Sequence, residues 1–238
     1  MKQSQMKQSL LILIATGMMT AQAEDVFSSM FESTAGSIQN ATVSTVIGGA
    51  VEASEEGPPA AVAKTAFLTY QPNAKTTAAV EQQILKTLLA KAPGKETEIK
   101  NLLKQANVVP NVRKAIQGLG YDPNELAVSL TLWVNTSFGQ LEDRDTTDAE
   151  NAAVLKQFRS AVQNAAGLKK LSNEDRQKTA EMLMYMTFFQ SVDVMAAQQN
   201  KPGYDLETVK ASIAENLKRF DLDPELYTVT ETGIGKKD

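Results

Sequence analysis

One long segment, residues 173–199, is apolar nearly all round when drawn as a helix, and it constrains the fold more than any other feature. Ser172 stands where it can cap this helix, and Glu174 and Asp175 suit the positive end of the helix dipole. A helix that is apolar on every side is either buried in a protein core or spans a membrane. Three polar residues interrupt the apolar run and favour the core: Glu181, Gln190 and Asp193.

A second apolar segment, residues 123–138, predicts another central helix. Asp122 and Pro123 form a start signal, because Asp accepts hydrogen bonds from the first free N–H groups and Pro fits the first helical position. Gly139 is expected to end this helix. Two such segments predict a fold in which apolar helices pack on each other at the centre.

The chain divides into four predicted parts. Residues 60–235 are expected to form an all-α domain, an irregular multi-helix bundle around the two apolar central helices, with shorter one-faced helices such as one near residues 80–88. Residues 24–59 are rich in Ser, Thr, Ala and Gly, lack a convincing helical period, and predict a flexible lead-in. Residues 1–23 have the features of a leader, and residues 236–238 are a short tail.

The C-terminal end carries two local patterns. Residues 227–234 contain Tyr, Val and Thr and are expected to be extended, and Gly233 and Gly235 are then expected to release the tail. Residues 220–226 resemble residues 120–126, and shared helix-start chemistry explains that likeness.

The leader predicts export. Lys2 and Lys7 precede a short apolar run, and the small residues Ala21 and Ala23 predict cleavage before Glu24. The run is about ten residues long, against the roughly 20 that span a bilayer, so a cleavable bacterial signal peptide is favoured over an anchor. We therefore expect a periplasmic or secreted protein. The mature chain would have 215 residues and a net charge of −6 in place of −4, which argues against nucleic-acid binding.

The composition excludes several kinds of chemistry. The chain has no His and no Cys, which excludes thiol nucleophiles, disulfides, His or Cys zinc sites and a Ser-His-Asp triad. Carboxylate, Lys, Tyr and Ser/Thr chemistry remains, together with all-oxygen metal sites and plain binding. No phosphate-binding loop or dinucleotide fingerprint is present, and no cofactor is expected.

Four polar residues within the apolar helices are candidates for a site: Asn135, Glu181, Tyr185 and Asp193. Glu181 and Asp193 lie about 18 Å apart along a helix axis at 1.5 Å per residue, too far to act as a carboxylate pair on one bond. Glu181 and Tyr185 are four residues apart, so a hydrogen bond between them is expected. A polar link inside the bundle explains this pair better than acid–base catalysis does.

Two further sets of residues have both a structural and a functional interpretation. Trp133, Met182 and Met186 could line a groove that binds a peptide, although core packing is the simpler explanation. An acidic cluster supplies oxygen ligands that would suit calcium, although it lacks the mid-loop Gly of a known calcium loop, and a solvated helix-capping loop is favoured. Its members are Asp143, Asp145, Asp148 and Glu150.

Three stretches of the C-terminal half resemble an uncharacterised family of exported bacterial proteins. They are residues 122–126 continuing to Trp133, residues 171–185, and residues 220–235. The resemblance implies an exported, mainly helical fold. It implies no activity, because none is assigned to the family.

These observations favour an exported, non-enzymatic helical protein that binds a protein or peptide partner. One alternative is a hydrolase that uses carboxylate and Tyr groups without His on envelope material. Another alternative is a membrane- or surface-associated structural protein that inserts its 38–51 segment. The sequence does not identify the partner or the oligomeric state.

Overall fold

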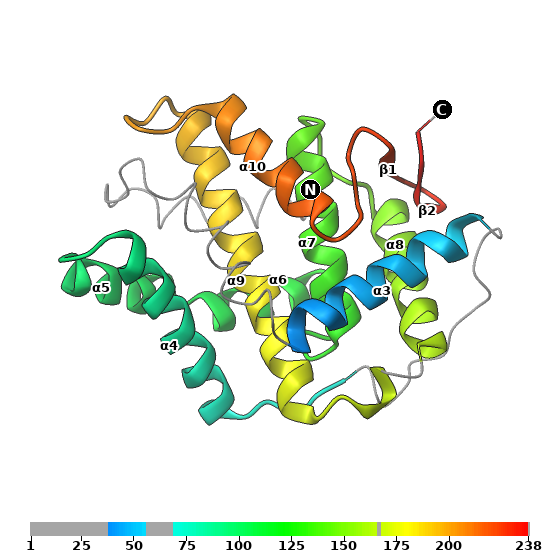
Figure 1. Cartoon of the computed structure of the whole chain (residues 1–238), viewed down its shortest axis with the longest axis horizontal. Coiled ribbons are helices and arrows are strands. Elements are labelled where there is room, and N and C mark those ends of the chain that lie inside the picture. Colours follow the sequence, from blue (N-terminus) through cyan, green and yellow to red (C-terminus); the bar gives the residue numbers. More distant parts are fainter. Residues whose placement is uncertain (1–37, 56–68, 166–167, 238) are drawn as a thin grey trace.

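The computed structural model describes residues 38–55, 69–165 and 168–237, which form a helical bundle with one small sheet (Figure 1). The predicted leader lies outside these residues, and so do residues 24–37 and 56–59 of the predicted lead-in. The elements are, in order, α3 (Ile38–Glu55), α4 (Ala74–Lys91), α5 (Glu96–Ala106), α6 (Val108–Gly118), α7 (Leu126–Leu141), α8 (Asp148–Asn164), η2 (Leu168–Lys170), α9 (Asn173–Gln198), α10 (Leu206–Lys218), β1 (Tyr227–Thr230) and β2 (Gly233–Lys236).

The centre of the fold is the packing of α7 on α9, and the prediction of two apolar central helices is confirmed. The other elements surround this pair, with α3 and α8 on one side, α4 on the other, and α10 across one end (Figure 1). Trp133 and Phe138 from α7 and Leu183 and Met184 from α9 are among the largest fully buried side chains. No described helix has the length and apolar character needed to cross a bilayer.

The two central helices differ in how well the sequence predicted their first residues. Ser172 caps α9 by accepting a hydrogen bond from the Asp175 N–H at 3.1 Å, as predicted. The predicted start of α7 is wrong by three residues, because Asp122 accepts from the Asn124 N–H at 3.0 Å in a turn and the helix begins at Leu126. An Asp-Pro pair satisfies such a turn as well as it satisfies a helix start.

The likeness between residues 120–126 and 220–226 comes from the way a helix stops. After α6, the Tyr121 N–H donates to the Ile116 carbonyl at 3.2 Å and Gly120 has a φ of 87°. After α10, the Leu222 N–H donates to the Leu217 carbonyl at 3.1 Å and Asp221 has a φ of 61°. Both segments thus end an α-helix with one residue in the left-handed conformation and continue into an Asp-Pro turn. The shared feature is mainly this way of ending a helix.

Residues 38–55 correct the prediction of a flexible lead-in and of a domain that begins at residue 60. They form α3, which packs against α8, α9 and β2. Four side chains of α3 are buried in the main core: Val43, Val46, Ile47 and Ala50. Their spacing of three, one and three residues places them on one helical face, so this helix belongs to the domain.

The C-terminal hairpin confirms the extended segment and corrects the expected release of the tail. β1 and β2 pair antiparallel, with Val229 opposite Ile234 and Thr230 opposite Gly233. The buried side-chain amide of Gln157 accepts from the Ile234 N–H at 2.7 Å and donates to the Ile234 carbonyl at 3.1 Å and the Ala50 carbonyl at 2.8 Å. Gln157 therefore joins α8 to the hairpin and to α3, as a neighbouring strand would.

The prediction that Gly139 ends α7 is wrong. Gly139 instead lies where two backbone segments approach each other closely. The helix continues to Leu141, and the Arg144 N–H donates to the Gly139 carbonyl at 2.9 Å. A Cβ atom at residue 139 would lie 2.7 Å from the Arg144 carbonyl oxygen. Because that neighbour is backbone, a side chain there would force the α7–α8 connection to move.

We expect Gly139→Ala to lower the free energy of unfolding by about 1–3 kcal/mol, the usual cost of overpacking. Gly48→Ala is the matched control, because Gly48 is also within a helix and a Cβ there would meet nothing within 4 Å. The control should gain about 0.5–1 kcal/mol from the loss of chain flexibility. Urea unfolding of both variants measures the difference, and equal effects of the two substitutions would contradict the close approach.

Candidate functional site

A short extended segment, residues 69–73, lies against the body of the bundle between the α6–α7 turn and the start of α9, and we call it the strap. The Tyr70 N–H donates to the Asn124 carbonyl at 2.9 Å, next to an isolated bridge between Thr69 and Glu125. The Tyr70 side chain is buried, and its hydroxyl donates to the Pro123 carbonyl at 3.2 Å.

Two side-chain amides of α9 hold the rest of the strap. Asn173 accepts from the Gln71 N–H at 2.6 Å and donates to the Gln71 carbonyl at 2.9 Å. One turn later, Gln177 accepts from the Asn73 N–H at 2.9 Å and donates to the Asn73 carbonyl at 2.9 Å. Each amide therefore pairs with the donor and the acceptor of one strap residue, which is the pattern that a neighbouring β-strand offers.

Glu181, one turn beyond Gln177, is fully buried and shares one oxygen among three donors. Its Oε1 accepts from the Thr77 hydroxyl at 2.8 Å, from Arg113 at 2.8 Å and from Gln177 at 2.9 Å. Its Oε2 is buried and has no hydrogen-bond partner in the described part of the chain. Arg113 also donates to the Tyr70 hydroxyl at 3.4 Å and lies over the Tyr70 ring, with 5.7 Å to the ring centroid.

Burial is the largest influence on the pKa values of Glu181 and Tyr70. It raises the pKa of Glu181 above its usual 4.5, and the Gln177, Thr77 and Arg113 contacts only partly oppose that rise. Burial likewise raises the pKa of the Tyr70 phenol, again against the opposing influence of Arg113. Burial thus opposes ionisation of both side chains, and the nearby Arg113 cation favours it.

The raised pKa of Glu181 predicts a pH dependence of stability. A carboxyl with a higher pKa in the folded than in the unfolded chain stabilises the fold below its unfolded pKa, near 4.5, and loses that contribution as the pH rises through the folded pKa. We expect the free energy of unfolding of the wild type, relative to Glu181→Gln, to fall as the pH rises above about 4.5. Urea unfolding of both proteins at several pH values measures it, and a difference that rises with pH would show that the Arg113 ion pair dominates.

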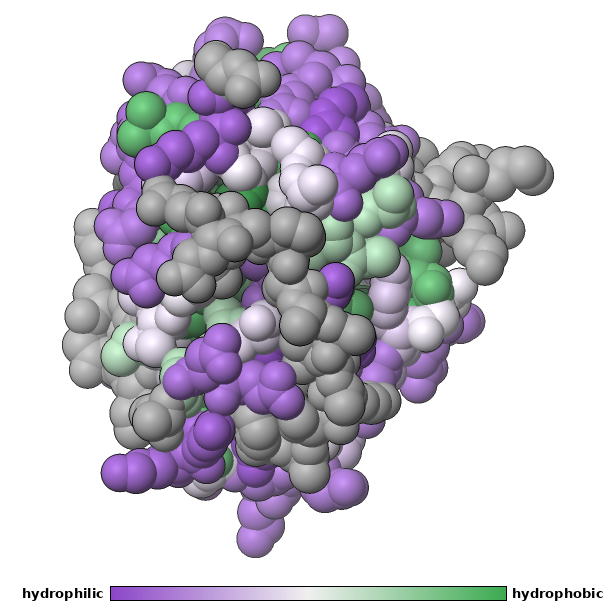
Figure 2. All heavy atoms as spheres, turned by 90° about the vertical axis from the view of Figure 1, so that its right-hand side faces the viewer, coloured by the Kyte–Doolittle hydropathy of each residue, from purple (hydrophilic) through white to green (hydrophobic). Residues whose placement is uncertain are grey.

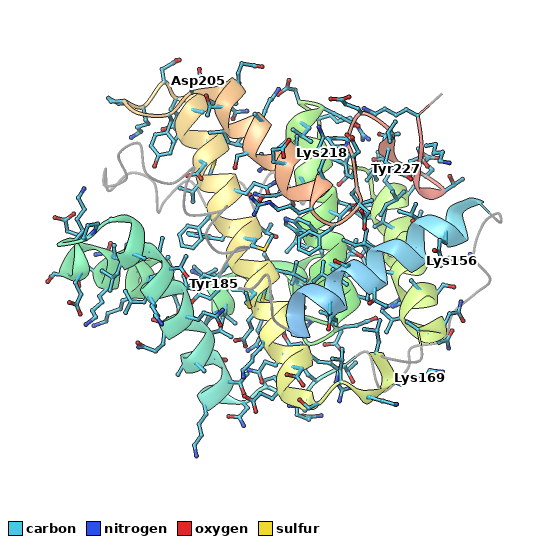
Figure 3. All side chains as sticks on the ribbon, viewed as in Figure 1. Lys156, Lys169, Tyr185, Asp205, Lys218 and Tyr227 are labelled. Atoms are coloured by element: carbon cyan, nitrogen blue, oxygen red, sulfur yellow. The ribbon has the colours of Figure 1, made fainter. Side chains whose placement is uncertain are left out.

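The predicted hydrogen bond between Glu181 and Tyr185 is wrong. Glu181 is occupied by Thr77, Arg113 and Gln177, and Tyr185 stacks on Phe189 with 6.2 Å between the ring centroids. Tyr185 lies on the side of α9 that faces α4 (Figure 3). Burial, followed by the charges of Glu81 and Glu181, raises the pKa of its phenol far above the usual 10.0.

The other polar candidates are buried elsewhere and do not join Glu181. Asn135 on α7 donates to the Asn151 side chain at 2.6 Å, which links α7 to α8. Asp193 is buried near the other end of α9. The structure thus brings none of Asn135, Tyr185 and Asp193 into hydrogen-bonding contact with the Glu181 carboxyl.

Trp133, Met182 and Met186 do not line an exposed groove, because all three side chains are buried in the main core. Trp133 is fully buried and meets the Phe220 ring edge-on, with 5.4 Å between the centroids. Among the described residues, Leu226 is the one large hydrophobic side chain that is strongly exposed. Among the residues drawn in colour on the hairpin side of the molecule, polar ones predominate, with small apolar areas between them (Figure 2).

The acidic cluster lies in the connection between α7 and α8 and at the start of α8, where basic side chains and helix capping engage it. Arg144 donates to Glu142 at 2.7 Å, to Glu150 at 2.9 Å and to the Val229 carbonyl at 3.0 Å. Glu150 also accepts from the Thr147 N–H and forms a capping box at the start of α8. Asp143 pairs with Lys210 at 2.6 Å. No set of three acidic, His or Cys side chains in the described ranges is arranged to hold a metal ion.

Sequence reasoning missed the residues that hold the strap and a second buried ion pair. Arg159 on α8 donates to both oxygens of Glu125, at 2.6 and 2.8 Å, and the Glu125 side chain is fully buried. Asn173, Gln177 and Glu181 recur every four residues, so their shared helical face was visible in the sequence. That spacing does not indicate that an extended segment, the strap, packs on this face.

The site thus holds the main chain of the strap against the bundle. It offers a carbonyl from the turn before α7, two side-chain amides from α9, and a closed recess for one phenol ring. These groups bind donors and acceptors of an extended backbone, and the buried Glu181 and Arg113 fix the geometry from behind.

No curated protein and no solved structure matches this chain. One family does match, over residues 10–235, and its description reads "Family of unknown function (DUF6683)". The match reaches well beyond the three C-terminal stretches, so the expectation of a resemblance limited to the C-terminal half is too narrow. Because the match covers nearly the whole sequence, the chain belongs to this family of unknown function.

Proposed function

We propose that this is an exported, non-enzymatic protein that binds a protein or peptide partner in the cell envelope. The observation that carries the proposal is the burial of the carboxylate and phenol groups at the site. Glu181 is fully buried, and its Oε1 is occupied by contacts that hold the strap. Tyr70 and Tyr185 are buried as well, and burial raises both phenol pKa values.

A hydrolase without His would need a carboxyl group that reaches its substrate. A general acid or base acts at hydrogen-bond distance, about 2.6–3.2 Å, from the proton that it transfers. Glu181 is enclosed by α4, α6 and α9, and Tyr185 and Asp193 are also buried, which weighs against this alternative.

The alternative of a membrane- or surface-associated structural protein depends on insertion of residues 38–51 into a membrane or a partner. Val43, Val46, Ile47 and Ala50 already pack in the main core, so this apolar face is in use within the fold. Insertion would have to break those contacts, and a partner-binding role requires no such rearrangement.

The export part of the proposal rests on the leader, residues 1–23. Expression of the full chain in a bacterial host should give a periplasmic or secreted product whose N-terminus is Glu24. N-terminal sequencing of the fractionated protein tests this. A full-length cytoplasmic product that retains Met1 would overturn the export assignment.

The binding part is tested by cross-linking the mature protein in intact cells of its source, followed by mass spectrometry and purification of each cross-linked protein. We expect one of them to bind the mature protein in isothermal titration with a fixed stoichiometry. Turnover of envelope material by the wild type that Glu181→Gln abolishes, with unchanged folding, would contradict the non-enzymatic assignment. Absence of any stoichiometric partner would contradict the binding role.

A further inference from the structure

We propose that the recess occupied by the strap is a peptide-binding groove, and that the strap is an intramolecular ligand that an extended segment of the partner replaces. This inference rests on the proposed function and names the surface that would carry it. The partner segment has a stated chemistry: a Tyr, followed by residues whose main-chain N–H and C=O groups are free at the first and third positions after it.

The first support is the kind of contact that holds the strap. Four hydrogen bonds join its main chain at Gln71 and Asn73 to the Asn173 and Gln177 side chains, and a fifth joins the Tyr70 N–H to the Asn124 carbonyl; the Asn73 carbonyl also accepts from Thr77 at the start of α4. Domains that bind an extended peptide beside a sheet edge use main-chain bonds for affinity and a side-chain pocket for specificity. Here a pair of amides on a helix replaces the sheet edge.

The second support is that the groove buries one side chain of the strap, the Tyr70 ring. Tyr70 is 3% exposed, its hydroxyl donates to the Pro123 carbonyl, and Arg113 lies over its ring. Gln71, Pro72 and Asn73, by contrast, are exposed. A groove that buries one aromatic ring and otherwise contacts the backbone would accept many sequences around that ring.

The third support is the rigidity of the groove. Glu181 bonds to Gln177 at 2.9 Å and to Arg113 at 2.8 Å, so it fixes both the second amide and the cation over the ring. Asn173 and Gln177 stand on the first turns of α9, whose later turns are in the main core. The two amides therefore stand at one end of a central helix, and Tyr70 is the strap side chain that reaches the main core.

The tethered strap sets the conditions for exchange. The strap continues directly into α4, which packs on α9, so it competes for the groove within the same chain at an effective concentration on the order of millimolar or above. A partner peptide must therefore bind more tightly than the strap or arrive when the strap is weakened. Weakening the strap should reveal the groove.

The test uses the mature full chain and a fluorescent peptide with the sequence of residues 67–75. Tyr70→Ala removes the ring of the strap and leaves the groove residues unchanged. We expect saturable binding to this variant, at least ~10-fold tighter than to the wild type. Adding Asn173→Asp, which turns a donor to the strap carbonyl into a repelling oxygen, should abolish it. A peptide that is N-methylated at the residue-71 amide should also fail, because it lacks the donor to Asn173.

Gln71→Pro supplies a second weakened strap, since it removes the Gln71 N–H from an exposed residue and keeps Tyr70 in place. Hydrogen exchange of the wild type at millimolar peptide gives a reading that needs no variant: the strap amides should exchange faster while α7 and α9 stay protected. No binding to either folded variant, or equal binding of the methylated peptide, would overturn the groove. That result would leave the proposed partner-binding function to the cross-linking experiment, which does not depend on where the partner binds.

Discussion

Replacing Trp133 with alanine is expected to lower the free energy of unfolding by about 3–5 kcal/mol, the usual cost of deleting a large core aromatic side chain. Trp133 is fully buried on α7 and packs edge-on against Phe220 at the end of α10. Its removal therefore leaves a cavity between two elements and also loses the aromatic contact. Urea unfolding measures the change, with far-UV circular dichroism as the signal because the substitution removes the one Trp of the chain.

Leu226→Ala is the matched control for this substitution. Leu226 is 59% exposed, so its truncation should change stability by about 0.5 kcal/mol or less. A groove-lining Trp133 would give a different pattern, in which the Ala variant folds with near-normal stability and loses partner binding. Equal, small effects of Trp133→Ala and Leu226→Ala would contradict the core assignment.

Arg159→Ala is expected to cost about 3 kcal/mol, because it leaves the Glu125 carboxylate buried without its cation. Arg159 meets both Glu125 oxygens, at 2.6 and 2.8 Å, and Glu125 is fully buried where the chain enters α7. The value lies at the lower end for broken buried pairs, since the Arg159 side chain is 25% exposed and water can reach part of the site. Thermal and urea unfolding should agree on it.

The control for Arg159→Ala is Lys210→Ala, which breaks an ion pair to the exposed Asp143. The Asp143 carboxylate is 62% exposed, so water solvates it when the cation is removed, and the control should lose only about 0–1 kcal/mol. An equal loss of unfolding free energy in both variants would contradict the prediction that the buried Glu125–Arg159 pair matters more to stability than the Asp143–Lys210 pair.

Apolar periodicity was enough to predict the central helices, and small residues explain where it failed. The long apolar run and the Ser172 cap defined α9, because both signals are local in sequence. The α3 helix was missed because Ala50 completes its buried face, and the Gly, Ser and Thr residues around that face suggested a linker. Counting Ala50 with Val43, Val46 and Ile47 yields the helical spacing that the structure shows.

The strap and the ion pair could not be predicted, because they join residues that are far apart in the sequence. Gln71 and Asn173 are separated by 102 positions, and Glu125 and Arg159 by 34. The Glu181 carboxyl was recognised as a structural polar group, but its partner was assigned within its own helix. Helix-surface spacing favoured Tyr185, whereas packing of α4 and α6 on α9 brought Thr77 and Arg113 to it.

Side-chain amides of α9 hold the strap, and amide hydrogen exchange tests these contacts directly. Gln177→Met keeps the volume of a buried side chain and removes its amide. We expect exchange at the Asn73 N–H, which donates to Gln177 at 2.9 Å, to rise at least ~10-fold, equivalent to a loss of about 1.4 kcal/mol, while the centre of α7 stays protected. Unchanged exchange at Asn73 in a folded Gln177→Met protein would contradict the account.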